Sequence, residues 1–511
     1  MTQLLVIIFY LGLLLGLGVF ANRFFKGTSK DYMLASNSIG PFLLLMSLFG
    51  TTMTAFAMVG ATGVTSKNGV GIYGELAGAA GIMHSLCFFL IGIPLWRIGR
   101  RLGYRTQIQF LRARFENNFV GFLLFPLLVI LIITYLLGGV VGAGAVISKV
   151  TEGAFQNIGW FESSNFGVPK QIASAFVCLV VLAYVFFGGM RGTAWANAFQ
   201  TLIFMVLGLV TFVAIANSMG GTNSIFENLR IASESVPEDK RSMANMKWGV
   251  YLTYLLIPIS VGMFPHIFQH WLTAKSAKSF KLPIVAHPIF VMIVWAPCVL
   301  IGLWANSQIT GAGVPPKTHP NDVLATMVSN HTFDLMGGLL TAGILAAIMS
   351  SLDSQFLCLG TVFTEDIVRN VSDKEISDRA IVWYARAFVI GIAVATFLLS
   401  LVLPKSVFEL GVWSFTGFTG LFPIVAVALY WKRATAAGVI GSILVTAISW
   451  SVLFWRSDFG SQKGYTFPES GPVVFAPILT VTLLSTIVLL VVSLMTKPPS
   501  DKTLSKFFNQ S

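Results

Sequence analysis

Charged residues are scarce in this chain. Asp, Glu, Lys and Arg together make up 11% of its 511 residues, whereas a typical soluble domain contains about 25%. Hydrophobic residues make up 55%. A soluble globule of this length needs far more polar side chains to cover its surface, so the composition excludes one and indicates an integral membrane protein.

Cysteine and recognisable catalytic motifs are also scarce. The six histidines, His266 and His270 among them, show no metal-ligand spacing on one helix, and we expect them to be interfacial or packing residues. The spans contain no paired acid and base groups, so we do not expect an enzyme. The spacing of the four cysteines matches neither a zinc site nor a disulfide scaffold, and all lie in apolar runs: Cys87, Cys178, Cys298 and Cys358.

What the chain has in abundance is long apolar runs. A membrane-spanning helix needs about 20 apolar residues, and the sequence predicts about thirteen such helices in a single all-α membrane domain covering 1–511. The first, 4–21, has no basic residue before it and no cleavage motif after it, so it is predicted to be a retained helix rather than a signal peptide. The others cover 41–64, 74–97, 119–147, 171–187, 193–217, 248–268, 283–306, 333–362, 379–402, 406–430, 434–456 and 472–495.

The charged residues predict an orientation for these spans. With the N-terminus outside and the C-terminus in the cytoplasm, the predicted inner segments contain about twice as many Lys and Arg residues as the outer ones, as the positive-inside rule requires. The net charge of +12 is therefore mostly topological, and we expect no nucleic-acid partner. The expected location is the plasma (inner) membrane.

Two spans are predicted to be interrupted near the membrane midplane. The segment 47–54 contains Gly50 among Ser and Thr residues, and the segment 258–265 carries Gly262 between Pro258 and Pro265. The two spans lie five spans apart, as a five-plus-five inverted repeat predicts, with repeat one at about 41–217, repeat two at about 248–430 and extra C-terminal helices at about 434–495. The alternative is that these small residues merely allow close helix packing.

One carboxylate lies deep within an apolar span. Asp353 follows Ser350 and Ser351 and precedes Ser354 within 346–355. Charges inside a span are costly and usually functional, and hard oxygen ligands clustered on one helix suit a hard cation such as Na⁺. The alternative is a satisfied polar patch between helices.

Four segments resemble motifs of the solute:sodium symporter family, whose members are Na⁺-coupled transporters with the leucine-transporter fold. The segment 188–200 resembles the family's G-G-x-[RK]…W-T-D-x-x-Q pattern, and 346–355 resembles its A-A-x-M-S-[ST]-x-x-S signature. The segments 101–115 and 421–438 resemble the loop after the third helix and a late helix with its following turn. The resemblance covers roughly 30–455, and the order of the four motifs is more specific than any one of them.

The resemblance implies a main sodium site and, as in some members of the family, a possible second one. Carbonyl groups of the broken helix and hydroxyl groups of the facing helix would form the main site, which maps onto Gly50, Met53, Ala347, Ser350 and Ser351. A second site, found in some members, maps onto Asn197, Ser350, Asp353 and Ser354. The family usually has Asp where this chain has Asn197, so we hypothesise that Asp353 compensates; the rival is one Na⁺ per solute.

The solute is less defined by the sequence. Thr51, Thr52 and Thr54 lie at the first break and Gly262 at the second, where they are predicted to line the solute pocket. The span 119–147 contains no Lys or Arg that could clamp a carboxylate. Sugars, amino acids, pantothenate-like solutes and monocarboxylates all remain open.

The sequence therefore predicts a symporter that imports a small organic solute with Na⁺, its co-transported ion, by alternating access. The alternatives are a proton-coupled or Na⁺-independent transporter, or a non-transporting membrane sensor of the same fold. The expected partners are the solute and the lipid bilayer, with no obligate protein partner.

Overall fold

A computed structural model describes residues 1–22, 28–71, 78–156, 158–243, 247–371, 376–403, 406–462, 464–471 and 473–508. Within these ranges the regular structure is helical, and the one β-type contact is an isolated bridge between Ile39 and Ala274. The predicted all-α membrane fold is confirmed.

The long helices follow the predicted apolar runs closely. They are α1 (Thr2–Asn22), α5 (Gly78–Cys87) with η4 (Phe88–Gly92) and α6 (Ile93–Leu102), α8 (Asn118–Val150), α9 (Lys170–Gly220), α14 (Lys281–Trp304), α16 (Asp334–Phe363), α18 (Asp378–Val402), α19 (Val407–Tyr430), α20 (Ala436–Arg456) and α21 (Pro477–Met495). Shorter connecting helices include α2 (Ser29–Leu34), α7 (Gln107–Phe115), α10 (Ile225–Glu234), α15 (Val323–His331), η9 (Thr364–Val368), α17 (Arg369–Val371) and α22 (Asp501–Phe508).

Both predicted interruptions are present. The first separates α3 (Pro41–Thr52) from η2 (Phe56–Gly60) and α4 (Ala61–Asn68) with a bend of 54°. The second separates α12 (Trp248–Tyr254) and η6 (Ile257–Gly262) from α13 (Pro265–Thr273) with a bend of 45°. At these breaks Met53 and Phe264 adopt extended backbone conformations, which frees main-chain groups from the helical hydrogen-bond pattern.

The number of spans stays a prediction. Among the described residues nine helices are long and apolar enough to cross a membrane, or eleven if each bent pair is one span. One of the nine, α9, has 51 residues, which at 1.5 Å per residue is about 77 Å and more than twice the bilayer core. Gly189 breaks α9 with φ 51° and ψ −157°, between the two spans that the sequence predicts there. The boundaries of the two repeats likewise stay a prediction.

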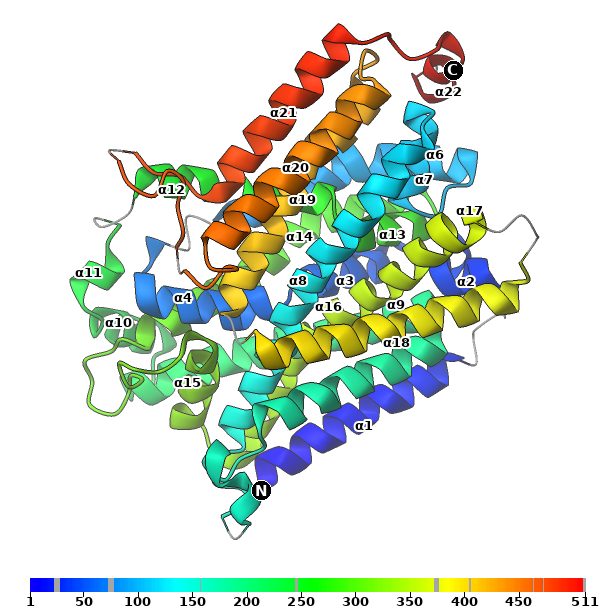
Figure 1. Ribbon diagram of the computed structural model, residues 1–511. Helices are drawn as coiled ribbons and strands as arrows, with labels where there is room; N and C mark the ends of the chain where they lie inside the picture. Colours follow the sequence, from blue (N-terminus) through cyan, green and yellow to red (C-terminus); the bar gives the residue numbers. More distant parts are fainter. Residues whose placement is uncertain are drawn as a thin grey trace.

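The helix α16 occupies the centre of the molecule. In the most apolar stretch of the segment that starts at Asp334, 83% of the residues are buried, compared with 28% in α18 and in α21. It packs against α9, α1, α8 and α3, while α20 and α21 run side by side on one flank (Figure 1). The outer helices instead expose large apolar side chains such as Leu398, Ile448 and Ile487, as a surface in contact with lipid requires.

Candidate functional site

The closest polar contact between the broken helix α3 and the central helix α16 joins Gly50 to Ser350. The Ser350 hydroxyl donates a hydrogen bond of 2.7 Å to the carbonyl oxygen of Gly50, and Thr51 Oγ1 donates one of 3.3 Å to the carbonyl oxygen of Ser350. A Cβ atom at Gly50 would lie 2.5 Å from Thr201 Oγ1. Glycine therefore lets α3 lie closely against α9 at the level of this contact.

All five residues predicted for the main sodium site are buried. The structure brings Gly50, Ala347 and Ser350 together, because the Ser350 hydroxyl also lies 2.9 Å from the Ala347 carbonyl oxygen. Ser351 Oγ donates instead to the Ile348 carbonyl within α16, and Met53 lies at the end of α3. The described residues contain no cluster of three or more His, Cys, Asp and Glu suited to a metal. Neutral oxygen atoms of this kind suit an alkali cation better than a transition metal.

A second polar cluster surrounds Asp353, one turn along α16. With the Asn197 amide assigned from its hydrogen-bond partners, its nitrogen lies 3.1 and 3.0 Å from the two Asp353 carboxylate oxygens, and its oxygen accepts from Ser354 Oγ at 3.0 Å. The Tyr184 hydroxyl donates to Asp353 Oδ2 at 3.1 Å. The predicted residues Asn197, Asp353 and Ser354 are thus in contact.

Asp353 has no charged protein partner in the described part of the chain. Its side chain is fully buried, and the ion pairs found among those residues do not include it. A buried carboxylate without a compensating charge is strongly unfavourable. The surroundings therefore favour occupancy by a cation or a proton at this carboxylate.

The sequence reasoning missed Tyr184 in this cluster, and it expected His270 to be only an interfacial or packing residue. Tyr184 reaches Asp353 from α9, and His270 on α13 lies 3.1 Å from Ser354 Oγ through Nε2 and 2.8 Å from Ser47 Oγ through Nδ1. His270 therefore links both broken spans to α16. The sequence offered one signal for this cluster: Tyr184 is a polar aromatic residue inside an apolar run, and its buried hydroxyl group needs a hydrogen-bond partner.

A small apolar cavity of about 30 Å³ lies between the two helix breaks. Of the predicted solute-binding residues, Thr52 lines it. Thr54 Oγ1 accepts from Tyr135, a cavity residue, at 3.3 Å, and Thr51 faces Ser350 as described above. Gly262 packs against the Phe422 ring. A Cβ atom added to Gly262 would lie 2.6 Å from a carbon atom of that ring. No Asp, Glu, Lys or Arg is among the described residues that line the cavity.

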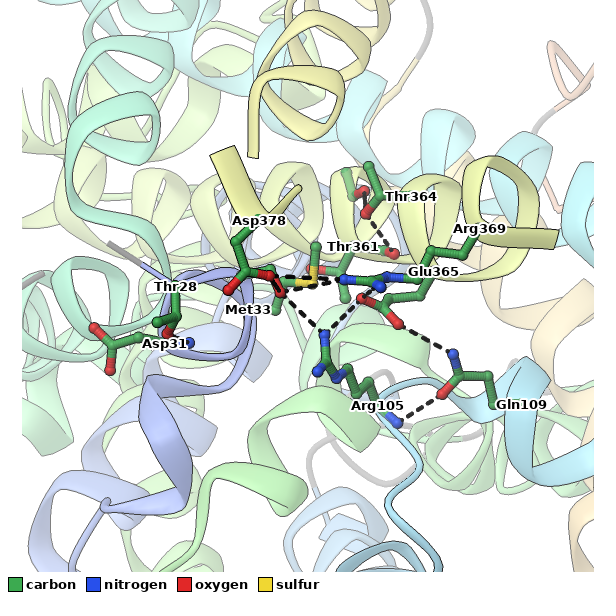
Figure 2. Close-up of polar contacts among 12 residues, drawn as sticks. Thr28, Asp31, Met33, Arg105, Gln109, Thr361, Thr364, Glu365, Arg369 and Asp378 are labelled. Carbon is green, nitrogen blue, oxygen red and sulfur yellow. Dashed lines mark hydrogen bonds and ion pairs between the residues drawn. The ribbon is translucent and has the colours of Figure 1, made fainter. Parts of the chain in front are cut away.

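A charged cluster made of residues from several short helices lies apart from the residues that line the cavity, and Figure 2 shows its ion pairs and hydrogen bonds. We define it as Ser29, Arg105, Gln109, Glu365, Arg369 and Asp378. Glu365 lies 2.8 Å from Arg105 Nη1 and 3.0 Å from Arg369 Nε, and it accepts a hydrogen bond from Gln109. Ser29 Oγ donates to Asp378 at 2.6 Å and accepts from Arg105 Nη1 at 3.2 Å. The charged cluster thus joins α2, α7 and the loop before it, η9, α17 and the start of α18.

The chain resembles known transporters over nearly its whole length. It is 26% identical over 493 residues to the osmoregulated proline transporter OpuE of Bacillus subtilis, covering 94% of this chain and 93% of the relative. It is also 26% identical over 495 residues to the sodium/proline symporter of Haemophilus influenzae, with the same coverage.

A solved structure and a family model point the same way. The structure of a Na⁺-coupled sialic acid symporter in a substrate-bound outward-open state has a TM-score of 0.75 at 18% identity, covering 98% of this chain and 99% of that one; at this identity the likeness shows the fold. A sequence model of the sodium:solute symporter family matches residues 32–446. The chain therefore belongs to the sodium:solute symporter family, as a Na⁺-coupled solute symporter of the membrane rather than an enzyme.

Proposed function

We propose that this symporter imports a small amino or imino carboxylate, of which proline is the type, together with Na⁺ held by Gly50, Met53, Ala347, Ser350 and Ser351. The observation that carries the proposal is the contact of Ser350 with the freed carbonyl of Gly50 at the break of α3. The two relatives named as proline carriers support the solute class. The cavity beside the same break, free of charged lining residues in the described chain, supports a solute that carries its own balanced charges.

Sodium binding at this contact would hold α3 against α16. In the structure Ser350 Oγ lies within hydrogen-bond distance of both the Gly50 and the Ala347 carbonyl oxygens, to either of which it can donate. A sodium ion would use the lone pairs of the same three oxygen atoms, so the hydroxyl hydrogen would turn away. An ion that binds only while the two helices lie together stabilises that arrangement over one in which they separate.

Met53 connects the proposed sodium site to the proposed solute site. It belongs to the proposed sodium ligands, and it also lines the cavity together with Thr52. A displacement of the chain at 50–54 would therefore change both sites at once. This shared segment makes the binding of Na⁺ and solute mutually favourable, which is the requirement for symport.

The second cation site is proposed at Asp353, with Asn197, Ser350 and Ser354. The rival stoichiometry of one Na⁺ per solute predicts that Asp353 has no part in sodium dependence. We expect a Hill coefficient for Na⁺ above one in uptake by the wild-type protein and near one in Asp353→Asn. A coefficient near one in both proteins contradicts the second site and leaves the first untouched.

The proposed orientation has the N-terminus outside and the C-terminus in the cytoplasm, in the plasma (inner) membrane. On this orientation every member of the charged cluster belongs to a predicted cytoplasmic segment. The ion pair of Glu365 with Arg105, which joins η9 to the loop before α7, would then close the path toward the cytoplasm. Arg369 pairs with Glu365 within the same helical segment. No obligate protein partner is needed for this cycle.

The decisive experiment measures Na⁺-dependent uptake of L-proline into liposomes containing the purified full chain. We expect uptake driven by an inward Na⁺ gradient and none with K⁺ or choline at equal ionic strength. A thermal-shift titration of the same protein with NaCl against KCl should show a saturable, Na⁺-specific rise in Tm. A folded sample that shows neither response contradicts the proposed function.

A further inference from the structure

Five aromatic side chains line the cavity: Phe56, Tyr135, Phe264, Trp295 and Phe415. Phe415 lies at the centre of the group, with its ring centroid 4.9 Å from those of Phe56 and Tyr135 and 5.6 Å from that of Phe264. Trp295 extends the group beyond Phe56 at 6.2 Å. Aromatic faces attract a cation such as an ammonium group. The rings therefore suit the ammonium group of an amino or imino carboxylate. The carboxylate group of the same solute needs a different partner.

Two histidines from different helices are in contact beside this cavity, and one of them lines it. His84 on α5 lines it, and His84 Nδ1 lies 3.0 Å from Nε2 of His287 on α14. The His287 side chain is fully buried and meets Phe49 and Phe88 at ring distances of 5.5 and 5.0 Å. Its own Nδ1 is buried with no hydrogen-bond partner in the described chain.

The unpartnered Nδ1 of His287 indicates which neutral tautomers the two histidine rings adopt. If His84 Nδ1 donates to His287 Nε2, the neutral His287 ring carries its hydrogen on Nδ1, which leaves a buried N–H without an acceptor. If His287 Nε2 donates, Nδ1 is a bare lone pair and His84 carries its hydrogen on Nε2. Buried N–H groups without an acceptor are rare, so the second arrangement is favoured. It gives the cavity wall an N–H donor at His84.

We infer that His84 is a specificity-determining residue of the solute site, whose Nε2–H donates a hydrogen bond to a carboxylate oxygen of the solute while His287 holds its ring in that tautomer. Nε2 of His84 is hydrogen-bonded to no described residue, and a neutral donor meets a carboxylate without adding net charge to the cavity. Together with the aromatic rings, this donor selects compact solutes with a carboxylate and an ammonium group. The inference rests on the proposed function and adds the groups that recognise the solute.

The test compares matched solutes on purified full-length protein in NaCl by thermal shift. The carboxylates are L-proline and L-alanine, and their partners without a carboxylate are pyrrolidine and ethylamine. We expect at least one carboxylate to raise the Tm of the wild type beyond the effect of Na⁺, and its partner to do nothing. D-glucose is added as a solute without either charged group. The inference is overturned if D-glucose alone raises the Tm, or if no solute raises it while the Na⁺ response persists. Both outcomes leave sodium binding intact.

Variants of the two histidines sharpen the test. His84→Leu should weaken carboxylate binding by about tenfold or more, as expected for losing a hydrogen bond to a charged group. His84→Gln, whose amide still donates, should retain part of the affinity, and His287→Leu should weaken it without touching the cavity wall. The control is Ser85→Ala on the same helix, since Ser85 is buried and does not line the cavity.

The sodium response separates the two possible failures. A Na⁺-specific rise in Tm in His84→Leu shows that the variant is folded and that its sodium site works. Wild-type carboxylate affinity in such a variant overturns the role of His84 and leaves the proposed function standing. Absence of any Na⁺-specific response in the wild type overturns the proposed function itself, and the inference with it.

Discussion

Two polar regions of the molecule are built on opposite principles. The contact of α3 with α16 uses neutral groups, the Ser350 hydroxyl and main-chain carbonyls, all buried. The charged cluster uses fixed ions, and its arginines Arg105 and Arg369 keep 27% and 33% of their side-chain surface exposed. A contact made of neutral oxygen atoms can accept a bound cation without repelling it. In the charged cluster the positive charges of the arginines are already balanced by the carboxylates. The first suits binding of a cation, and the second suits a contact that opens and closes.

The largest effect is expected from removing the hydroxyl group at the neutral contact. Ser350→Ala should reduce the apparent Na⁺ affinity of uptake by about 100-fold, the upper end for changes around a bound metal, because the same hydroxyl meets two of the proposed carbonyl ligands. Na⁺ titration of uptake in liposomes measures it. The matched control is Ser442→Ala, since Ser442 is equally buried and pairs with Ser485 far from the site. An unchanged Na⁺ dependence in Ser350→Ala contradicts the site.

A smaller effect is expected from forcing the helices apart without removing a ligand. Gly50→Ala would place a methyl group 2.5 Å from Thr201 Oγ1, and overpacking of this kind costs about 1–3 kcal/mol. We expect a loss of Na⁺ affinity of about 30-fold in thermal-shift titration. The double variant Gly50→Ala with Thr201→Ala should recover part of it, because it removes the clashing hydroxyl. If the double variant recovers no Na⁺ affinity, the spacing of the helices at Gly50 does not determine Na⁺ binding.

The smallest effect is expected at the charged cluster. Glu365→Gln should weaken the closed arrangement by about 1 kcal/mol, since its ion pairs are partly exposed to solvent, and so raise the open population about fivefold. Alkylation of Cys358, buried two turns earlier on α16, reports the opening in a background where the other three cysteines are replaced. Faster alkylation in Glu365→Gln supports the assignment. Equal rates would mean that the charged cluster does not control access at that end.

The sequence predicted most of what depends on one segment at a time. Apolar length located α8, α16 and α18 to within a few residues of their ends, and Gly and Pro located both breaks. It did not predict contacts between distant segments. Arg105 and Glu365 are 260 positions apart, and His84 and His287 are 203 apart.

Hydropathy treats each residue as apolar or polar and carries no information on such pairing. Tyr184 was therefore hidden in an apolar run, although its hydroxyl reaches Asp353. The residue pattern of 346–355 suggested a cation site on one helix, but the full residue sets proposed for the two sodium sites came from resemblance to a family. The structure adds that Asn197 and Asp353 touch each other.

The break in α9 has a consequence for how this gene can change in length. Tyr184 precedes Gly189 and Asn197 follows it, yet both side chains reach the same carboxylate, that of Asp353. Short connections between helices normally accept insertions and deletions because little depends on their length. Here one added residue would rotate one partner away from Asp353 while the other stayed in place. We expect this turn to tolerate substitutions in its sequence and to be intolerant of any change in its length.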